Sequence, residues 1–118
     1  NTNKSFKQQL ADQISVLLSG SDIDYEVIGD IEIDSNKRFE LIRAIRELAI
    51  NARRHSACSQ ITVNLSHEKI VITDNGSGGV VAKSNSYGLE GVQERLALIG
   101  ALLNTESNST GTKMIIKF

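Results

Sequence analysis

The sequence predicts an α/β sandwich, in which a mixed and mostly antiparallel sheet carries helices on one face. Three observations lead to this fold class. Segments with apolar residues spaced three and four apart are interleaved with segments in which apolar and polar residues alternate. Two of the strand-like segments are joined by a short polar turn, as in an antiparallel hairpin. Interleaved elements of both kinds are typical of a sheet covered by helices.

The composition supports a single globular domain. With 118 residues, 40% of them hydrophobic, the chain can bury a core without disulfides or a metal, so we expect one domain over residues 1–118. Aromatic residues make up only 4%, so this core must be aliphatic. The chain begins with Asn1 rather than Met, and we therefore expect it to be a fragment of a longer protein.

Charge and cysteine content exclude several classes of protein. The formal net charge of -1 argues against a strongly basic nucleic-acid surface. No apolar run approaches the roughly 20 residues of a membrane span. The single cysteine, Cys58, cannot form an internal disulfide, which fits a reducing compartment such as the cytoplasm. We interpret it as a small, partly buried apolar residue.

The first half of the chain predicts a helix, a strand and a second helix. Residues 5–19 carry an apolar stripe at helical spacing, and Gly20 is a natural stop. Residues 23–28 alternate between apolar and polar, as strands do. Residues 34–35 offer an N-cap for a long helix over residues 36–55.

The second half begins with the predicted hairpin. Residues 60–65 alternate between apolar and polar, and residues 69–73 predict a second strand. The short polar turn between them includes His67, which we expect to be exposed. Residues 74–87 are rich in glycine and have no clear period, so they are predicted to be a loop.

The end of the chain is predicted to contain one more helix and one more strand. Leucine, valine and isoleucine recur on one side of a helix over residues 88–103. Residues 104–111 are polar and predict a turn, and residues 112–118 predict the final strand.

The long helix has two chemically different sides. A helical wheel places six apolar residues on one side: Phe39, Ile42, Ile45, Leu48, Ala49 and Ala52. It places four polar ones on the other, with His55 at the margin: Glu40, Glu47, Asn51 and Arg54. Such a face is by default a solvated surface. Only Asn51, a middling helix former, departs from that interpretation.

A glycine-rich segment, Asp74-Asn-Gly-Ser-Gly78, follows the second strand of the hairpin. It is compatible with an ordinary turn. It is equally compatible with a site, because a carboxylate fixed at a strand end can accept a hydrogen bond from the exocyclic amine of adenine. Neighbouring glycines would let the backbone approach the ring. The Walker phosphate loop, by contrast, is absent from the sequence.

Two further glycine signals follow. Gly88-Leu-Glu-Gly91 opens a predicted helix, where free backbone N–H groups favour phosphate oxygens, although small residues there also serve packing. Gly111-Thr112 precedes the last strand and by itself indicates only a turn.

In series, these motifs resemble those of the GHKL ATPases, which have the Bergerat fold. The series comprises E-x-x-x-N-x-x-R-H from Glu47, D-N-G-x-G from Asp74, Y-G-L-x-G-V-x-E-R from Tyr87, and G-T at Gly111. The superfamily includes gyrase, MutL-type repair proteins and histidine kinases. The third motif is most similar to histidine kinases with short catalytic domains, which pair with LuxR-type response regulators. The resemblance covers about residues 36–118.

The resemblance implies roles for four residues of the long helix. Asn51 would be the magnesium ligand and thereby part of the nucleotide site. Glu47 would be a candidate general base or water-orienting residue, and Arg54 a basic catalytic residue near the phosphates. His55 would lie close to the nucleotide.

It also implies an adenine site. Asp74 would be the adenine-reading carboxylate, supported by the hydroxyl of Thr112. Gly76 and Gly78 would lie beneath the adenine and at the hinge of a lid.

A second glycine box would lie beside the phosphates and comprise Gly88, Leu89 and Gly91. The sequence departs from the family at Gly79, where a bulky apolar residue is usual, and in its short lid over residues 79–87.

The function implied is that of a histidine kinase catalytic domain. It would bind ATP with Mg²⁺ and supply the γ-phosphoryl to a histidine on a separate dimerisation domain in two-component signalling. Neither His55 nor His67 has the setting of a phosphoacceptor, so the chain alone would not autophosphorylate. Its partners would be that dimerisation domain and a response regulator, with no nucleic acid and no direct membrane contact. It would be the cytoplasmic portion of a membrane-bound sensor.

Two alternatives remain compatible with the same motifs. The chain could be a serine kinase of the anti-sigma-factor type, whose target is a serine of a partner protein. It could also be a GHKL interaction module that binds no nucleotide, although intact Glu47, Asn51 and Asp74 argue against this.

Overall fold

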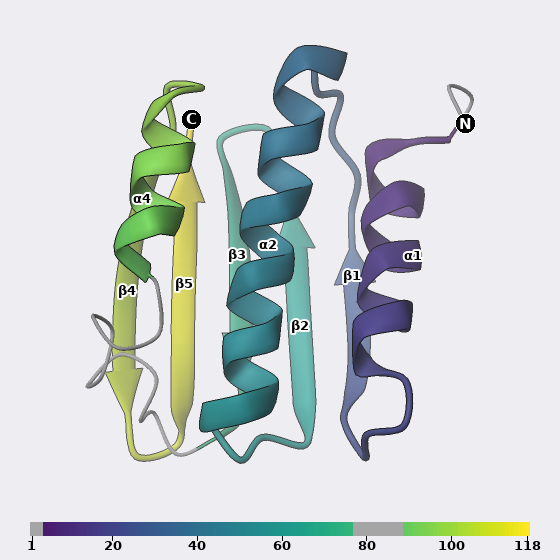
Figure 1. Cartoon of the computed structure of the whole chain (residues 1–118), viewed down its shortest axis with the longest axis vertical. Coiled ribbons are helices and arrows are strands. Elements are labelled where there is room, and N and C mark those ends of the chain that lie inside the picture. The colour runs from purple at the N-terminus through teal and green to yellow at the C-terminus, as the bar shows by residue number, and fades with distance from the viewer. Residues whose placement is uncertain (1–3, 77–88) are drawn as a thin grey trace.

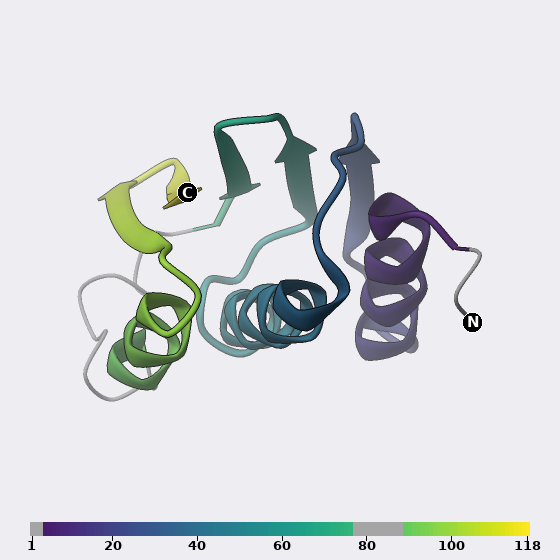
Figure 2. The ribbon, with the colours of Figure 1, turned by 90° about the horizontal axis from the view of Figure 1, so that it is seen from above.

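The computed structural model of the chain describes residues 4–76 and 89–118. Figure 1 shows a five-stranded sheet in the order β1-β2-β3-β5-β4, and Figure 2 shows all three labelled helices on one side of it. The predicted α/β sandwich is therefore confirmed. The elements are α1 (Phe6–Leu18), β1 (Asp24–Ile28), α2 (Ser35–His55), β2 (Gln60–Leu65), β3 (Lys69–Asp74), α4 (Leu89–Ala97), β4 (Leu102–Asn108) and β5 (Gly111–Lys117).

The sheet is mixed, with one parallel and three antiparallel pairings. β1 pairs with β2 in parallel, which requires a crossover, and α2 provides it. The β2–β3 hairpin, the β3–β5 pair and the β4–β5 hairpin are antiparallel. Because residues paired across strands share a face, the buried residues of β3 and β5 line up beneath the helices.

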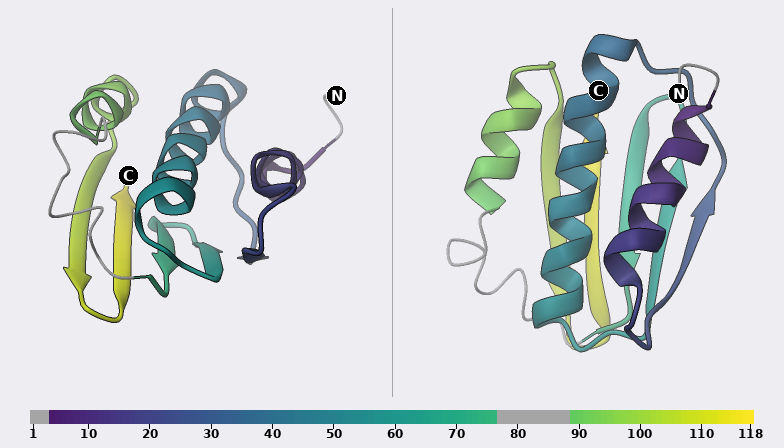
Figure 3. Two further views of the ribbon diagram at one scale, coloured as in Figure 1. Left: turned by 60° about the horizontal axis from the view of Figure 1, so that its bottom comes forward. Right: turned by 45° about the vertical axis from the view of Figure 1, so that its right-hand side comes forward.

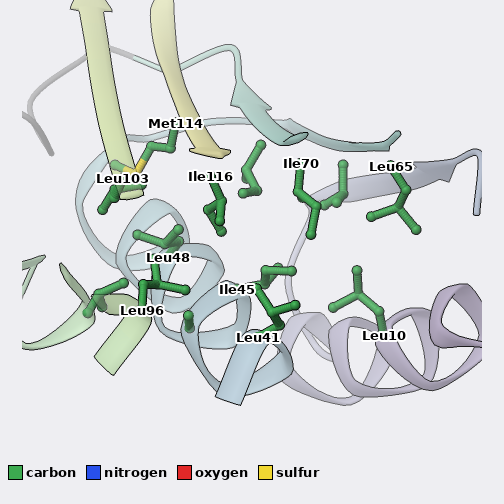
Figure 4. Close-up of a cluster of buried hydrophobic side chains, with 14 of the residues drawn as sticks. Leu10, Leu41, Ile45, Leu48, Leu65, Ile70, Leu96, Leu103, Met114 and Ile116 are labelled. Atoms are coloured by element: carbon green, nitrogen blue, oxygen red, sulfur yellow. The ribbon is translucent and has the colours of Figure 1, made fainter. Parts of the chain in front are cut away.

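The core lies between the sheet and the helices. Figure 4 shows leucine and isoleucine side chains from α1, α2 and α4 meeting those of the strands. Phe6 is the one aromatic residue among the buried hydrophobic residues that the structure describes, so the core is aliphatic as expected. The other face of the sheet is open and more polar, in agreement with the alternation in the strand sequences.

The start of α1 is held by two side chains. The hydroxyl of Ser5, the N-cap residue, accepts a hydrogen bond from the backbone N–H of Gln8 at 3.1 Å. The Oδ1 atom of Asp30 accepts one from the N–H of Lys7 at 3.1 Å. These bonds satisfy two of the free donors at the helix start and join it to the chain after β1.

The long helix α2 begins one residue before the predicted start and ends at the predicted residue, His55. Its first turn is closed by backbone bonds to the carbonyl of Asp34, whose side chain makes no capping bond. Most of the apolar side of the helical wheel is buried, but Phe39, which the wheel places on that side, is 64% exposed. Leu41 and Ala44 are buried in addition.

The predicted helix over residues 88–103 was also wrong at its end. The helix α4 stops at Ala97 and is closed by a Schellman motif around Gly100, whose φ is 78°. In this motif the N–H of Ala101 donates to the carbonyl of Leu96 at 3.0 Å, and that of Gly100 to Ala97 at 3.1 Å. Gly100 ends the helix because it adopts the left-handed conformation without a Cβ penalty.

The residues that follow were predicted to form a turn over 104–111, but most of them belong to β4. This strand pairs with β5 along its full length, from Leu102 opposite Lys117 to Asn108 opposite Gly111. Its composition is polar because most of it faces water, and only Leu103 is buried. A polar strand of this kind is specified by its partner strand rather than by its own pattern.

A strained residue at the end of α2 gives a first prediction. Ala57 has a φ of 55°, a left-handed conformation that disfavours any residue with a Cβ. Ala57→Gly should raise the free energy of unfolding by about 0.5–1 kcal/mol, since relief of the strain exceeds the extra entropy of glycine in the unfolded chain. Urea denaturation measures the change. In the middle of α1, Ala11→Gly should lower stability, and a loss in both variants would contradict the argument.

Candidate functional site

One end of the sheet collects the polar residues singled out in the sequence. The C-terminal ends of α2, β3 and β4 and the start of β5 all meet there, at the lower end of Figure 1 and of the right-hand view in Figure 3. Thus segments far apart in the sequence converge at one place. A hollow of about 380 Å³ lies at this end, lined among others by Asp74, Ser107 and Thr112.

A polar row crosses three strands on the helix side of this end. Asp74 of β3 pairs with Thr112 of β5, which pairs in turn with Ser107 of β4. Asp74 and Thr112 are buried, with exposed fractions of 7% and 2%. The hydroxyl oxygens of Ser107 and Thr112 are 3.5 Å apart. Hydroxyl groups thus continue the row in which the carboxylate stands.

Hydrogen bonds to the Asp74 carboxylate offset only part of the cost of its desolvation. Desolvation raises its pKa, while hydrogen bonds from the backbones of Gly76 and Thr112 and from the Ser56 side chain oppose the rise. The bond from the Gly76 N–H to Oδ1 measures 2.9 Å. A carboxylate in this position gains from any additional donor, which is what an exocyclic amine would provide.

Two glycines allow the backbone to close around Asp74. A Cβ on Gly76 would overlap the carbonyl oxygen of Ser56, just beyond the end of α2. A Cβ on Gly111 would overlap the carbonyl oxygen of Asp74 itself. The sequence alone does not show this close approach of β5 to β3 at Gly111.

Asn75, inside the same motif, holds the neighbouring strand. Its Oδ1 accepts hydrogen bonds from the N–H groups of Ser59 at 2.8 Å and Gln60 at 3.0 Å, and its Nδ2 donates to Ser59 Oγ at 2.9 Å. It therefore ties the start of β2 to the end of β3. This role was not predicted, although an Asn before Gly often indicates hydrogen bonds between side chain and backbone.

The polar side of α2 is not uniformly solvated. Glu47 and Arg54 are exposed, His55 is half-buried, and Asn51 is buried with 5% exposed. The default interpretation of a solvated face is thus wrong for Asn51. The side-chain amide oxygen of an Asn can be a ligand of Mg²⁺. A Mg²⁺ ion that is bound with phosphates needs few ligands from the protein.

The adjacent arginines of α2 have different settings. The Nη1 atom of Arg53 donates to the backbone carbonyls of Leu17 and Ser19, the latter at 3.4 Å, so this side chain joins α2 to the end of α1. Arg54 points to a different side of the helix, as successive helical residues do, and is exposed. The structure thereby separates a structural arginine from the candidate catalytic one.

The remaining candidates are only partly within the described residues. Gly78 and Gly88, together with the lid over residues 79–87, lie outside them. Leu89 is buried with 4% exposed, as part of the core, and Gly91 is exposed. Cys58 is half-buried and His67 exposed, as expected.

The described residues contain neither a candidate metal cluster nor a candidate membrane span. Residues 4–76 and 89–118 contain no cluster of three or more His, Cys, Asp or Glu side chains that could hold a metal. None of the helices in that part of the chain is long and apolar enough to cross a membrane.

Sequence comparison relates the chain to bacterial kinases. It is 31% identical over 122 residues to the sensor histidine kinase LiaS of Bacillus subtilis, a match that covers 97% of this chain and 34% of that protein. It is 31% identical over 106 residues to the histidine-protein kinase/phosphatase DegS of Brevibacillus brevis, covering 83% and 28%. The chain thus spans about a third of the length of these relatives. No family model matches it.

Comparison with solved structures agrees on the fold. The histidine kinase domain of the blue-light activated kinase of Erythrobacter litoralis superposes with a TM-score of 0.80 at 17% identity, covering 97% of this chain and 64% of that one. The ATP-binding domain of PrrB from Mycobacterium tuberculosis gives 0.69 at 21% identity, covering 96% and 90%.

The chain thus shares its fold with the histidine kinase domain and the ATP-binding domain of these two proteins. The sequence relatives are sensor histidine kinases, of whose length this chain corresponds to about a third.

The raised pKa of Asp74 predicts a pH-dependent stability. The folded state binds a proton at Asp74 more readily than the unfolded chain, so burial of this residue costs stability as the pH rises through its raised pKa. Asp74→Asn should therefore gain stability relative to the wild type from acidic to neutral pH. Urea titrations at several pH values measure the difference.

Asp12 provides the opposite control. The hydrogen bond from Lys4 lowers its pKa, so Asp12→Asn should lose stability relative to the wild type as the pH rises from strongly acidic values. A pH-independent difference for Asp74→Asn would contradict the desolvation of the carboxylate.

Gly76 and Gly91 differ in the space available for a Cβ atom, so replacing each by alanine should have opposite effects on stability. Gly76→Ala should destabilise the domain by about 1–3 kcal/mol, because the Cβ meets backbone that cannot rotate away. Gly91→Ala should stabilise it by about 1 kcal/mol, since a Cβ in α4 would meet only open space. Thermal unfolding distinguishes the two, and equal effects would count against the close approach at Ser56.

Proposed function

We propose that this chain is the ATP-binding catalytic domain of a sensor histidine kinase, which binds Mg-ATP and supplies the γ-phosphoryl to a histidine on a separate domain. The observation that carries the proposal is the buried carboxylate of Asp74, which stands at the end of β3 beside a hollow and lacks full compensation. Buried carboxylates of this kind are expected at functional sites rather than in a packed core.

In the proposed adenine half of the site, Asp74 accepts a hydrogen bond from the exocyclic amine. Thr112 supports the carboxylate from the adjacent strand, where its backbone already bonds to it. Gly76 keeps the backbone close to the end of α2, and Gly78 would serve as the hinge of the lid. The row Asp74–Thr112–Ser107 gives the ring edge a polar wall on a rigid sheet.

In the proposed phosphate half, the last turns of α2 provide the polar groups. Asn51 would hold Mg²⁺, which supplies neutralisation of the phosphate charge. Glu47 would act as a base or orient a water, and Arg54 would stabilise charge on the transferred group. His55 would lie beside the nucleotide. The segment with Gly88, Leu89 and Gly91 would present backbone N–H groups at the start of α4.

The remaining steps belong to the rest of the protein. Since the chain corresponds to about a third of its relatives, we propose that residues 1–118 form one domain of a longer kinase. The histidine to be phosphorylated would stand on a dimerisation domain, and a response regulator would receive the phosphoryl group. The chain alone would not autophosphorylate, and we place it in the cytoplasm.

Nucleotide binding gives the direct test of the adenine half. Isothermal titration of the chain with ATP and ADP should show saturable, Mg²⁺-enhanced binding. Asp74→Asn should weaken it roughly 10- to 150-fold, because a hydrogen bond to a charged group contributes about 1.5–3 kcal/mol. Asp24→Asn, at the start of β1, is the matched control and should bind as the wild type does. Unchanged affinity in Asp74→Asn would refute the adenine assignment.

The phosphate half is tested by the metal dependence. Asn51→Ala should remove most of the enhancement of ATP binding by Mg²⁺ while leaving ADP binding in EDTA within about twofold, since the adenine contacts remain. Titrations with and without Mg²⁺ measure both quantities. Because Asn51 is buried, thermal unfolding of the variant must first show a folded chain. A full response to Mg²⁺ in a folded variant would exclude Asn51 as the ligand.

A further inference from the structure

A second hollow lies on the helical side of the molecule, between α1 and the first half of α2. It has a volume of about 770 Å³, and its lining extends along α2 from Ser35 to Arg46. The two helices lie side by side and run in the same direction, as the right-hand view of Figure 3 shows. Since Asp74 lies near the other end of α2, this groove is separate from the proposed nucleotide site.

The α2 wall of the groove combines an exposed aromatic ring with arginines. Phe39, Ile42, Arg43 and Arg46 have the spacing of one helical face. The Phe39 side chain is 64% exposed, and the guanidinium carbon of Arg43 lies 5.6 Å from the centre of its ring. An exposed Phe beneath an arginine offers both apolar area and positive charge to a partner.

The charges in the groove are unbalanced. An ion pair joins Lys4 to Asp12, which neutralises this acidic residue of the groove. Arg38 is used internally, since its guanidinium donates to the backbone carbonyls of Lys4 and Ile33. Among the described residues that line the groove, no further carboxylate balances the charges of Arg43 and Arg46. The Nε atom of Arg46 is also buried without a hydrogen-bond partner.

We propose that this groove docks an acidic amphipathic helix of a partner protein. Its apolar face would cover Phe39 and Ile42, and its Asp or Glu side chains would pair with Arg43 and Arg46. Guanidinium and carboxylate groups match in geometry, and their pairing would compensate the charge that the groove leaves unbalanced. Residues 35–46 extend about 17 Å along α2, which matches roughly three turns of a docked helix.

The shape of the surface favours a helix over a membrane. A groove between two helices accommodates a third helix, whereas a lipid surface requires a convex or flat apolar face. Polar side chains from α1, including Gln9 and Gln13, line the opposite wall. A partner bound here would leave the Asp74 end of the molecule open, so the proposal holds whether or not the chain binds nucleotide.

Titration of the 118-residue chain with a designed peptide tests the proposal. The probe is a capped helical peptide of about 14 residues with two leucines on one face, flanked by glutamates at helical spacing. We expect saturable binding with a Kd on the order of 10–100 μM. An NMR titration measures it, and the chemical shift changes should be confined to groove residues. A peptide with glutamine in place of glutamate should bind at least about tenfold more weakly.

Variants of the chain locate the contact. Arg43→Glu and Phe39→Ala should each weaken binding of the acidic peptide by about tenfold or more. Lys117→Glu makes the same charge change on the open side of the sheet and should leave the affinity within about twofold. All three positions are exposed, so thermal unfolding should confirm that each variant is folded.

Four results would overturn the proposal. One is the absence of saturable binding, and another is equal affinity for the acidic and glutamine peptides. A third is a dimer of the chain, seen by sedimentation, that Phe39→Ala abolishes, because the occupant would then be a second copy. The last is binding to phosphatidylserine vesicles that Arg43→Glu abolishes while the peptide fails to compete.

Discussion

The pairing of β3 with β5 determines where the functional groups of this domain lie. Its register sets Asp74 opposite Thr112, on the face that the helices cover. If one of the two strands slipped by one residue, its side chain of this pair would turn to the open face of the sheet and the pair would be separated. The close approach of Gly111 to the carbonyl of Asp74 depends on the same register. The sheet thus acts as the rigid base on which the polar end is built.

Much of the fold could be predicted because its elements carry their own patterns. The strand β2 alternates cleanly, β3 has a short apolar run, and α2 has a stripe of apolar residues long enough to define it. The strand β4 could not be predicted, since its polar sequence forms a strand only beside β5. Phe39 lies with the apolar residues on the helical wheel but is exposed. The wheel gives the direction of a side chain around the helix axis, but not whether another element covers it.

The candidate site shows the same division. Asp74, Gly76 and Thr112 are visible in the sequence as a series of motifs, and the structure brings them to one end of the sheet. Asn75 joins β2 to β3 through hydrogen bonds to Ser59 and Gln60, which lie 16 and 15 positions before it in the sequence. No local pattern indicates such bonds. The helical wheel already assigns Arg54, and not Arg53, to the polar side, but only the structure shows that Arg53 bonds to the end of α1.

The bonds from Arg53 to the carbonyls of Leu17 and Ser19 have a mechanical consequence. They connect the end of α1 to the last turns of α2, the segment that also carries Asn51 and Arg54. A rotation or shift of α1 would therefore pull on that segment through a rigid guanidinium rather than through soft apolar packing. In a multidomain protein, α1 would act as a lever whose displacement changes the spacing of polar groups at the far end of α2.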